Sequence, residues 1–109
     1  MALIRRFEAY WHSPLMGTPI TSVCESFSQA QKEILDVCDN IQNRWQSGRL
    51  SDAEKNELLY SIKITCKTYN NETQLKRNKT NMEFPVWSIA FQGLEGIDAV
   101  ARQFSENLS

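Results

Sequence analysis

The longest regular pattern in the chain is a seam of apolar residues that runs from residue 20 to residue 45 in steps of three and four. This spacing places the side chains on one face of an α-helix, with a polar stripe on the opposite face. Thr18 followed by Pro19 is typical of a helix N-cap with proline at the first helical position. We therefore expect one long helix of about seven turns. Its seam consists of Ile20, Val23, Phe27, Ala30, Ile34, Val37, Ile41 and Arg44 or Trp45.

The segment that follows, residues 47–52, predicts a tight connection between two helices. Gly48 suits the left-handed conformation that often ends a helix. The run from Ser51 to Glu54 has the pattern of a capping box, in which Ser51 caps the Glu54 amide and the Glu54 carboxylate reaches back. So short a turn favours antiparallel neighbours, and the sequence therefore predicts an αα-hairpin at this point.

Residues 60–68 fit a helix and a strand almost equally well. A helical seam would use Leu59, Ile62, Cys66 and Tyr69. A strand would alternate Tyr60, Ile62, Ile64 and Cys66. The β-branched residues of the segment support the strand, whereas the capping box just before it favours the helix. We predict a helix here, and the strand stays open as the alternative.

Both ends of the chain also show helical spacing. The apolar residues of segment 2–12 fit a short amphipathic helix, and those from Pro85 to the end fit a second long helix. Gly93 and Gly96 lie inside the second pattern, which continues across them in phase. We attribute them to the close approach of a neighbouring backbone.

The remaining segment, residues 70–81, is polar and predicts a loop, with one helical turn over residues 73–77. Together the elements predict an all-α fold, a bundle of about four helices of which two are long. The length of 109 residues is the usual size of one domain, so residues 1–109 are expected to form a single domain.

Composition and charge narrow the class of protein. Hydrophobic residues make up 41% of the chain and charged residues 23%, which is enough apolar surface for a folded core. The net charge of −1 gives no global field that would hold a polyanion, so nucleic-acid binding would need a local cluster. The three cysteines form no Cys-x-x-Cys pair, no secretory leader is recognisable and no apolar run could span a membrane. We expect buried free thiols and a cytoplasmic protein.

Recognisable catalytic chemistry is absent from the sequence. His12 is the single histidine, and it stands beside Pro14 at the end of a predicted helix with no patterned nucleophile nearby. A pair of His12 with a cysteine distant in the sequence stays open. The carboxylates lie along one helix without a Glu-x-x-His motif, and the glycines form no phosphate loop. We expect no enzyme activity, no metal and no cofactor.

Two features of the sequence could serve binding. Segment 63–79 contains five basic residues and only one acidic residue, Glu72, and Tyr69 lies among them. Such clusters hold phosphate backbones, although a solvated loop is the more frequent interpretation. The second feature is an excess of aromatic residues at Phe84, Trp87 and Phe91, where core packing is the more frequent interpretation.

These observations favour binding over catalysis. We expect a non-enzymatic protein-binding module, an inhibitor or immunity-type protein that occludes a functional surface of its partner. The alternative is a small nucleic-acid-binding protein that uses segment 63–79, and a homo-oligomer is a third hypothesis. The partner's identity does not follow from the sequence. The predicted partner-binding residues are Asp36, Asp39, Tyr69, Lys76, Arg77, Lys79, Phe84 and Trp87.

Overall fold

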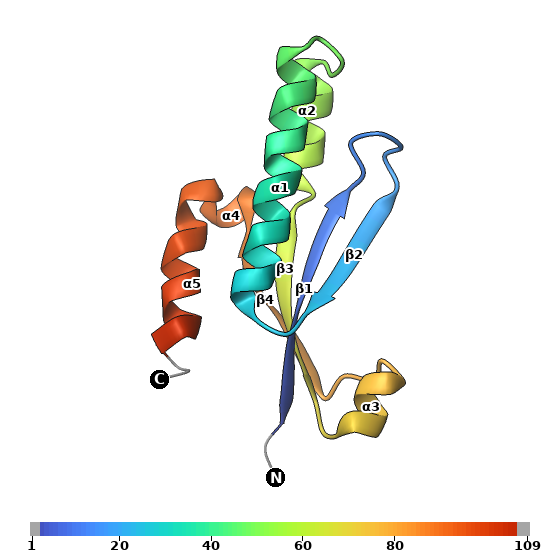
Figure 1. Cartoon of the computed structure of the whole chain (residues 1–109), viewed down its shortest axis with the longest axis vertical. Coiled ribbons are helices and arrows are strands. Elements are labelled where there is room, and N and C mark those ends of the chain that lie inside the picture. Colours follow the sequence, from blue (N-terminus) through green and yellow to red (C-terminus); the bar gives the residue numbers. More distant parts are fainter. Residues whose placement is uncertain (1–2, 107–109) are drawn as a thin grey trace.

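The computed structural model describes residues 3–106 and shows an α+β fold (Figure 1). A four-stranded antiparallel sheet is covered on one face by helices, so the predicted all-α bundle is wrong. In chain order the elements are β1 (Ile4–His12), β2 (Pro19–Cys24), α1 (Phe27–Gln46), α2 (Asp52–Tyr60), β3 (Lys63–Tyr69), α3 (Glu72–Lys76), β4 (Met82–Ser88), α4 (Ile89–Gln92), a 3-10 turn η1 (Leu94–Gly96) and α5 (Ile97–Glu106).

The strand order of the sheet is β2-β1-β3-β4, so β1 and β3 are central and β2 and β4 are the edges. Phe7 of β1 lies opposite Cys24 of β2 and Cys66 of β3. Figure 1 shows α1 lying across the sheet and α2 packed beside it. The turn between these two helices and the short helix α3 lie at opposite ends of the elongated molecule (Figure 1).

The core lies between the helices and one face of the sheet. Phe7 and Ala9 of β1 point into it and are buried, whereas Glu8 and Tyr10 point to the other side, which we call the open face. Three aromatic rings from β1, α1 and α5 join the layers. They are Phe7, Phe27 and Phe104, with ring centroids 4.8–5.7 Å apart.

The helix predicted over residues 2–12 is wrong, because residues 4–12 form β1; residue 2 lies outside the described part of the chain. The apolar residues of this segment satisfy two periods at once. Phe7 and Trp11 belong to the helical pattern, but together with Ala9 they also alternate as a strand does. Pairing with two neighbouring strands decides the outcome, and that pairing is a long-range effect.

The long helix is confirmed only from Phe27 onward. Its N-cap is Ser26, whose hydroxyl accepts a hydrogen bond from the Gln29 amide, and not Thr18 as the sequence suggested. Residues 19–24 are strand β2, and the segment before them is the turn of a β-hairpin in which Gly17 has a φ of +72°. Proline lacks an amide hydrogen, but at the first residue of an edge strand no hydrogen bond of the sheet is lost.

The αα-hairpin prediction is confirmed. Gly48 has a φ of +80° after the end of α1. Both hydrogen bonds of the capping box are present, because the Glu54 amide donates to Ser51 Oγ at 3.1 Å and the Ser51 amide donates to Glu54 Oε1 at 3.0 Å. Lys55 Nζ lies 3.7 Å from the centre of the Trp45 ring and ties α2 to the end of α1.

The ambiguous segment 60–68 contains the end of one element and most of the next. Helix α2 stops at Tyr60 and strand β3 begins at Lys63, so the predicted helix is wrong beyond residue 60 and the strand alternative is right from Lys63 onward. Ile62, Ile64 and Cys66 have no exposed surface and belong to the core, in which Ile64 and Cys66 lie between β1 and β4.

The helix predicted from Pro85 onward is wrong in its first part, where β4 continues to Ser88. Gly93 has a φ of +72°, which interrupts the helix, and its carbonyl accepts a hydrogen bond from Trp87 Nε1 at 3.0 Å. Helix α5 confirms the later part, up to Glu106; residues 107–109 lie outside the described part. Helix α3 confirms the helical turn predicted over residues 73–77.

Candidate partner-binding surface

The two edges of the sheet are protected to different degrees. The β4 edge contains Pro85 and an irregularity in its register with β3 between Ile64 and Thr65, and Glu83 adds a charge. Prolines, bulges and charges are the usual means by which a strand edge avoids pairing with another chain. Strand β2 has a regular register, no charged residue and only Pro19 at its start. The β2 edge is therefore open to an additional strand.

The hairpin turn shows which backbone groups of β2 face outward. The Ser13 amide donates to the Thr18 carbonyl at 2.8 Å, which makes this a hydrogen-bonded pair. Hydrogen-bonded and non-hydrogen-bonded pairs alternate along an antiparallel ladder. By this alternation and the register of β1 with β2, Thr21 and Val23 fall in non-hydrogen-bonded pairs with β1. Their amide and carbonyl groups consequently point away from the sheet, and their side chains are exposed on the open face.

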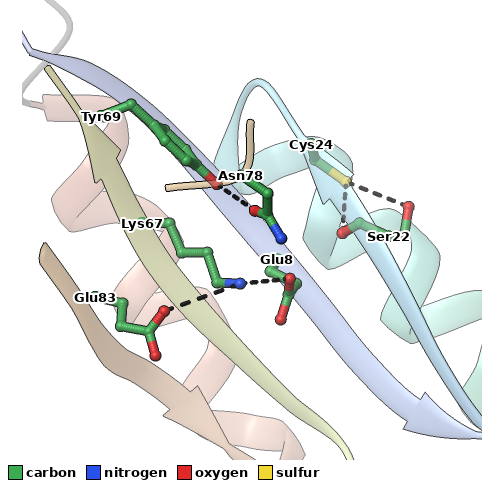
Figure 2. Close-up of polar contacts among 7 residues, drawn as sticks. All are labelled: Glu8, Ser22, Cys24, Lys67, Tyr69, Asn78 and Glu83. Atoms are coloured by element: carbon green, nitrogen blue, oxygen red, sulfur yellow. Dashed lines mark hydrogen bonds and ion pairs between the residues drawn. The ribbon is translucent and has the colours of Figure 1, made fainter. Parts of the chain in front are cut away.

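A groove runs beside this edge, between β2 and α1. Three adjoining hollows of about 470, 430 and 210 Å³ form it, and all three are lined by Asp36. We call this feature the β2–α1 groove. The side of the groove that α1 forms consists of Gln29, Lys32, Glu33, Asp36, Val37 and Asn40. Ser22 and Cys24 of β2 face it, and their contacts at 3.8 and 3.9 Å are drawn in Figure 2.

The charged side chains that line the groove are two carboxylates and one ammonium group, so its net charge is negative. Glu33 Oε2 is buried, and no described protein group lies within hydrogen-bond distance of it. Asp36 is exposed one turn further along α1. Lys32 is the only cationic side chain among the described residues that line the three hollows. Burial raises the pKa of the Cys24 thiol; the hydrogen bond with Ser22 lowers it, the negative charge of Glu33 raises it, and the net effect is a rise.

The tip of the β1–β2 hairpin extends the same side of the molecule. Leu15 and Met16 at the tip are 75% and 78% exposed. A further hollow of about 330 Å³ lies between this tip and α2. Exposed apolar side chains at the rim of an acidic groove are typical of a contact surface for another molecule.

The sequence-predicted binding residues do not form one site. Asp36 lines the β2–α1 groove, whereas Asp39 is exposed on α1 outside the lining of the hollows. Lys76 and Arg77 lie at the end of α3 and Lys79 follows them. All three are exposed, at the end of the molecule far from the α1–α2 turn (Figure 1).

The two aromatic candidates on β4 differ in exposure. Phe84 is 42% exposed, while Trp87 is 1% exposed and belongs to the core. Tyr69 is also buried, and its hydroxyl donates to Asn78 Oδ1 at 3.3 Å beside α3 (Figure 2). Tyr69 therefore holds the β3–α3 connection in place. Phe91 of α4, at 93%, is more exposed than Phe84.

The basic run of segment 63–79 is divided in space. Lys67 donates to Glu8 Oε2 at 2.8 Å on the open face and lies 3.9 Å from Glu83 (Figure 2). Burial disfavours the ammonium form of Lys67, but the bond to Glu8 and the charges of both carboxylates outweigh this, so its pKa is raised. Lys63 lies 4.9 Å from the centre of the Tyr10 ring. Two of the five basic residues are thus occupied by contacts within the sheet.

Reactive groups are scarce in the described residues. His12 Nε2 lies 3.1 Å from the Tyr10 hydroxyl, and no hydrogen bond within residues 3–106 joins it to a cysteine. All three cysteines are buried and free, as expected, and burial raises the pKa of Cys66 and that of Cys38, the latter to about 11. No described cluster of three or more His, Cys, Asp or Glu side chains could hold a metal ion, and no described helix is long and apolar enough to cross a membrane.

Comparison with known family models, curated proteins and solved structures finds no match for the chain.

The sequence pattern did not assign Glu33, which it placed on a solvated helix face, or the backbone of Thr21 and Val23 to a binding surface. The alternation of apolar and polar residues from Ile20 to Cys24 is a strand signal, but the seam of the following helix runs through the same residues in phase. The exposed edge depends on which strands pair, which a local pattern does not contain.

Proposed function

We infer that the protein is a non-enzymatic protein-binding module of the inhibitor or immunity type, which covers a functional surface of its partner. One observation carries this inference: an unprotected strand edge lies directly beside an acidic groove and an exposed apolar hairpin tip. An exposed strand edge of this kind invites aggregation unless a partner or another device covers it. The position of this unprotected edge next to a charged groove supports a binding role.

The packing of the chain supports the same function. The groove is formed by α1 and β2, which are held against β1 by a core that includes Phe7, Phe27 and Ile34. A surface on rigid elements loses little entropy on binding, and its carboxylates would favour the encounter with a basic partner. We further propose that the protein acts in the cytoplasm, where a reducing environment keeps its three cysteines as thiols.

The test is affinity capture by the tagged full chain from its own host's lysate, after nuclease treatment and a high-salt wash. Two charge-reversed variants are compared with the wild type: Asp36→Arg in the groove and Asp39→Arg on the same helix outside it. We expect the wild type to capture one protein in a fixed molar ratio. Asp36→Arg should lose this protein and Asp39→Arg should keep it. Addition of the wild-type chain should also lower the activity of the captured protein.

Two outcomes would contradict the proposal. A captured protein that both variants retain equally would place the binding surface elsewhere. Nucleic acid that is held at low salt and released at high salt would favour the basic run, above all Lys76, Arg77 and Lys79.

A further inference from the structure

We propose that the ligand of this surface is an extended basic peptide segment, which adds to the sheet as a fifth strand beside β2 and places a lysine or arginine against Glu33 and Asp36. The inference rests on the proposed function and specifies the partner's chemistry and its mode of binding. Strand addition of this kind draws affinity from main-chain hydrogen bonds and specificity from alternate side chains.

The outer edge of β2 offers main-chain donors and acceptors to an added strand. Thr21 and Val23 each present an amide and a carbonyl away from β1, and Pro19 presents a carbonyl. These groups recur at every second residue, which is the spacing that an added strand requires. At the other edge, Pro85 and the register irregularity of β4 interrupt this regular spacing of backbone groups.

The dimensions of the groove suit one strand. Strand β2 has six residues and is therefore about 20 Å long. The part of α1 that lines the groove, from Gln29 to Asn40, extends over about 17 Å. An added strand would lie about 4.8 Å from β2, so that alternate side chains would face the groove while the others would join Thr21 and Val23 on the open face.

The negative charge of the groove favours basic side chains at the peptide positions that face it. Glu33 Oε2 is buried without a protein donor, and a lysine or arginine would supply a charge-assisted hydrogen bond to it. Asp36 lies one turn away on the same side of α1 and could bind the same cation or a second one two residues along. Val37 and the exposed Leu15 provide apolar contact for the stems of these side chains.

The same carboxylates argue against a second copy of this chain as the occupant. Pairing of β2 with β2 across a two-fold axis would bring Glu33 and Asp36 toward the equivalent acidic groups of the other copy. Like charges that meet at an interface disfavour it, whereas a basic segment removes the repulsion.

The probe for the test is a seven-residue peptide with blocked ends, Thr-Lys-Thr-Lys-Thr-Val-Thr, whose two lysines lie two residues apart on one face of a strand, and its matched control replaces both lysines with glutamate. Binding to the full ¹⁵N-labelled chain is followed by amide chemical shifts and by hydrogen exchange. We expect the lysine peptide to slow exchange of the Thr21 and Val23 amides and to bind at least 10-fold more tightly than the glutamate peptide.

Variants separate the two parts of the proposal. Thr21→Pro removes an outward amide without breaking a bond to β1 and is expected to weaken peptide binding at least 10-fold, whereas Thr21→Val keeps the amide and binds normally. Glu33→Gln is expected to weaken the lysine peptide about 10-fold, and Asp39→Asn should leave it unchanged. Far-ultraviolet circular dichroism of each variant confirms that the sheet is intact.

Three results would overturn the inference: equal binding of the two peptides, shifts that map away from β2, or no binding of the lysine peptide at millimolar concentration. Protection of Thr21 and Val23 that depends on protein concentration without any peptide would identify a second copy as the occupant. If the peptide fails while Asp36→Arg still abolishes capture of the partner, the proposed function stands and only the strand mode is lost.

Discussion

Replacement of Ala9 with leucine distinguishes the observed sheet from a helical N-terminal segment. Ala9 has no exposed surface, since its side chain points from the central strand β1 into the core, between Ser22 of β2 and Ile64 of β3 in the register. Leucine adds three carbon atoms where no space is left. Overpacking of this kind costs about 1–3 kcal/mol, which corresponds to a fall of roughly 5–20 °C in Tm for a domain of this size.

The assay is urea denaturation of the wild type and the variant, followed by far-ultraviolet circular dichroism. Ala53→Leu is the matched control, because Ala53 is exposed in α2 and the same addition there should change the free energy of unfolding by less than about 0.5 kcal/mol. In a helix over residues 2–12, Ala9 would lie off the apolar seam and leucine would be tolerated. An Ala9→Leu variant as stable as the control would therefore refute the position of Ala9 in a central strand.

Three further predictions concern the hairpin, the thiols and the aromatic rings. Ser51→Ala removes the capping box of α2 and should lower the free energy of unfolding by about 1 kcal/mol, whereas Ser51→Gly should cost only a few tenths, as measured by urea denaturation. Burial raises the pKa of Cys38 from 9.0 to about 11, so on raising the pH the unfolded chain loses this proton first. The free energy of unfolding should fall as the pH rises from about 9 to 11, less steeply in Cys38→Ala, and equal slopes would contradict the shift. A double-mutant cycle of Phe27→Ala and Phe104→Ala should give a coupling of about 0.5–1.5 kcal/mol from the stacked rings, and additive costs would mean that α5 is not packed there.

The parts of the fold that the sequence predicted correctly are those encoded by local contacts. Ser51 and Glu54 are three residues apart and make both bonds of the capping box, and Gly48 needs only its own backbone to take a positive φ. The seam from Phe27 to Ile41 is buried as a helix face. Each of these features can be recognised within a few residues of sequence.

The parts that were wrong depend on contacts between distant segments. Phe7 and Trp11 fit a helical and a strand pattern, and the choice is made by pairing with residues 63–69, about 60 positions away. Pro19 follows Thr18 in a pattern that begins helices, but here it follows a hairpin turn and opens a strand. Local patterns do not show which distant segments pair, and this is why the sheet was not predicted.

The candidate site was predicted only in part for the same reason. Asp36 was recognised from the charged stripe of the helix, and it lines the β2–α1 groove. The groove itself exists because β2 is an edge strand, and strand order cannot be read from composition or spacing. Trp87 illustrates the reverse error, since an aromatic side chain that could serve binding is in fact buried.

The central claim, that β2 is an open strand edge beside the groove, is tested most directly by hydrogen exchange of the free chain, measured amide by amide along β2. The structure predicts alternation: the amides of Thr21 and Val23 exchange rapidly, and those of Ile20, Ser22 and Cys24, which bond to β1, are protected. Uniform protection of all five amides would mean that the edge is already covered, and uniform rapid exchange would mean that β2 is not paired with β1.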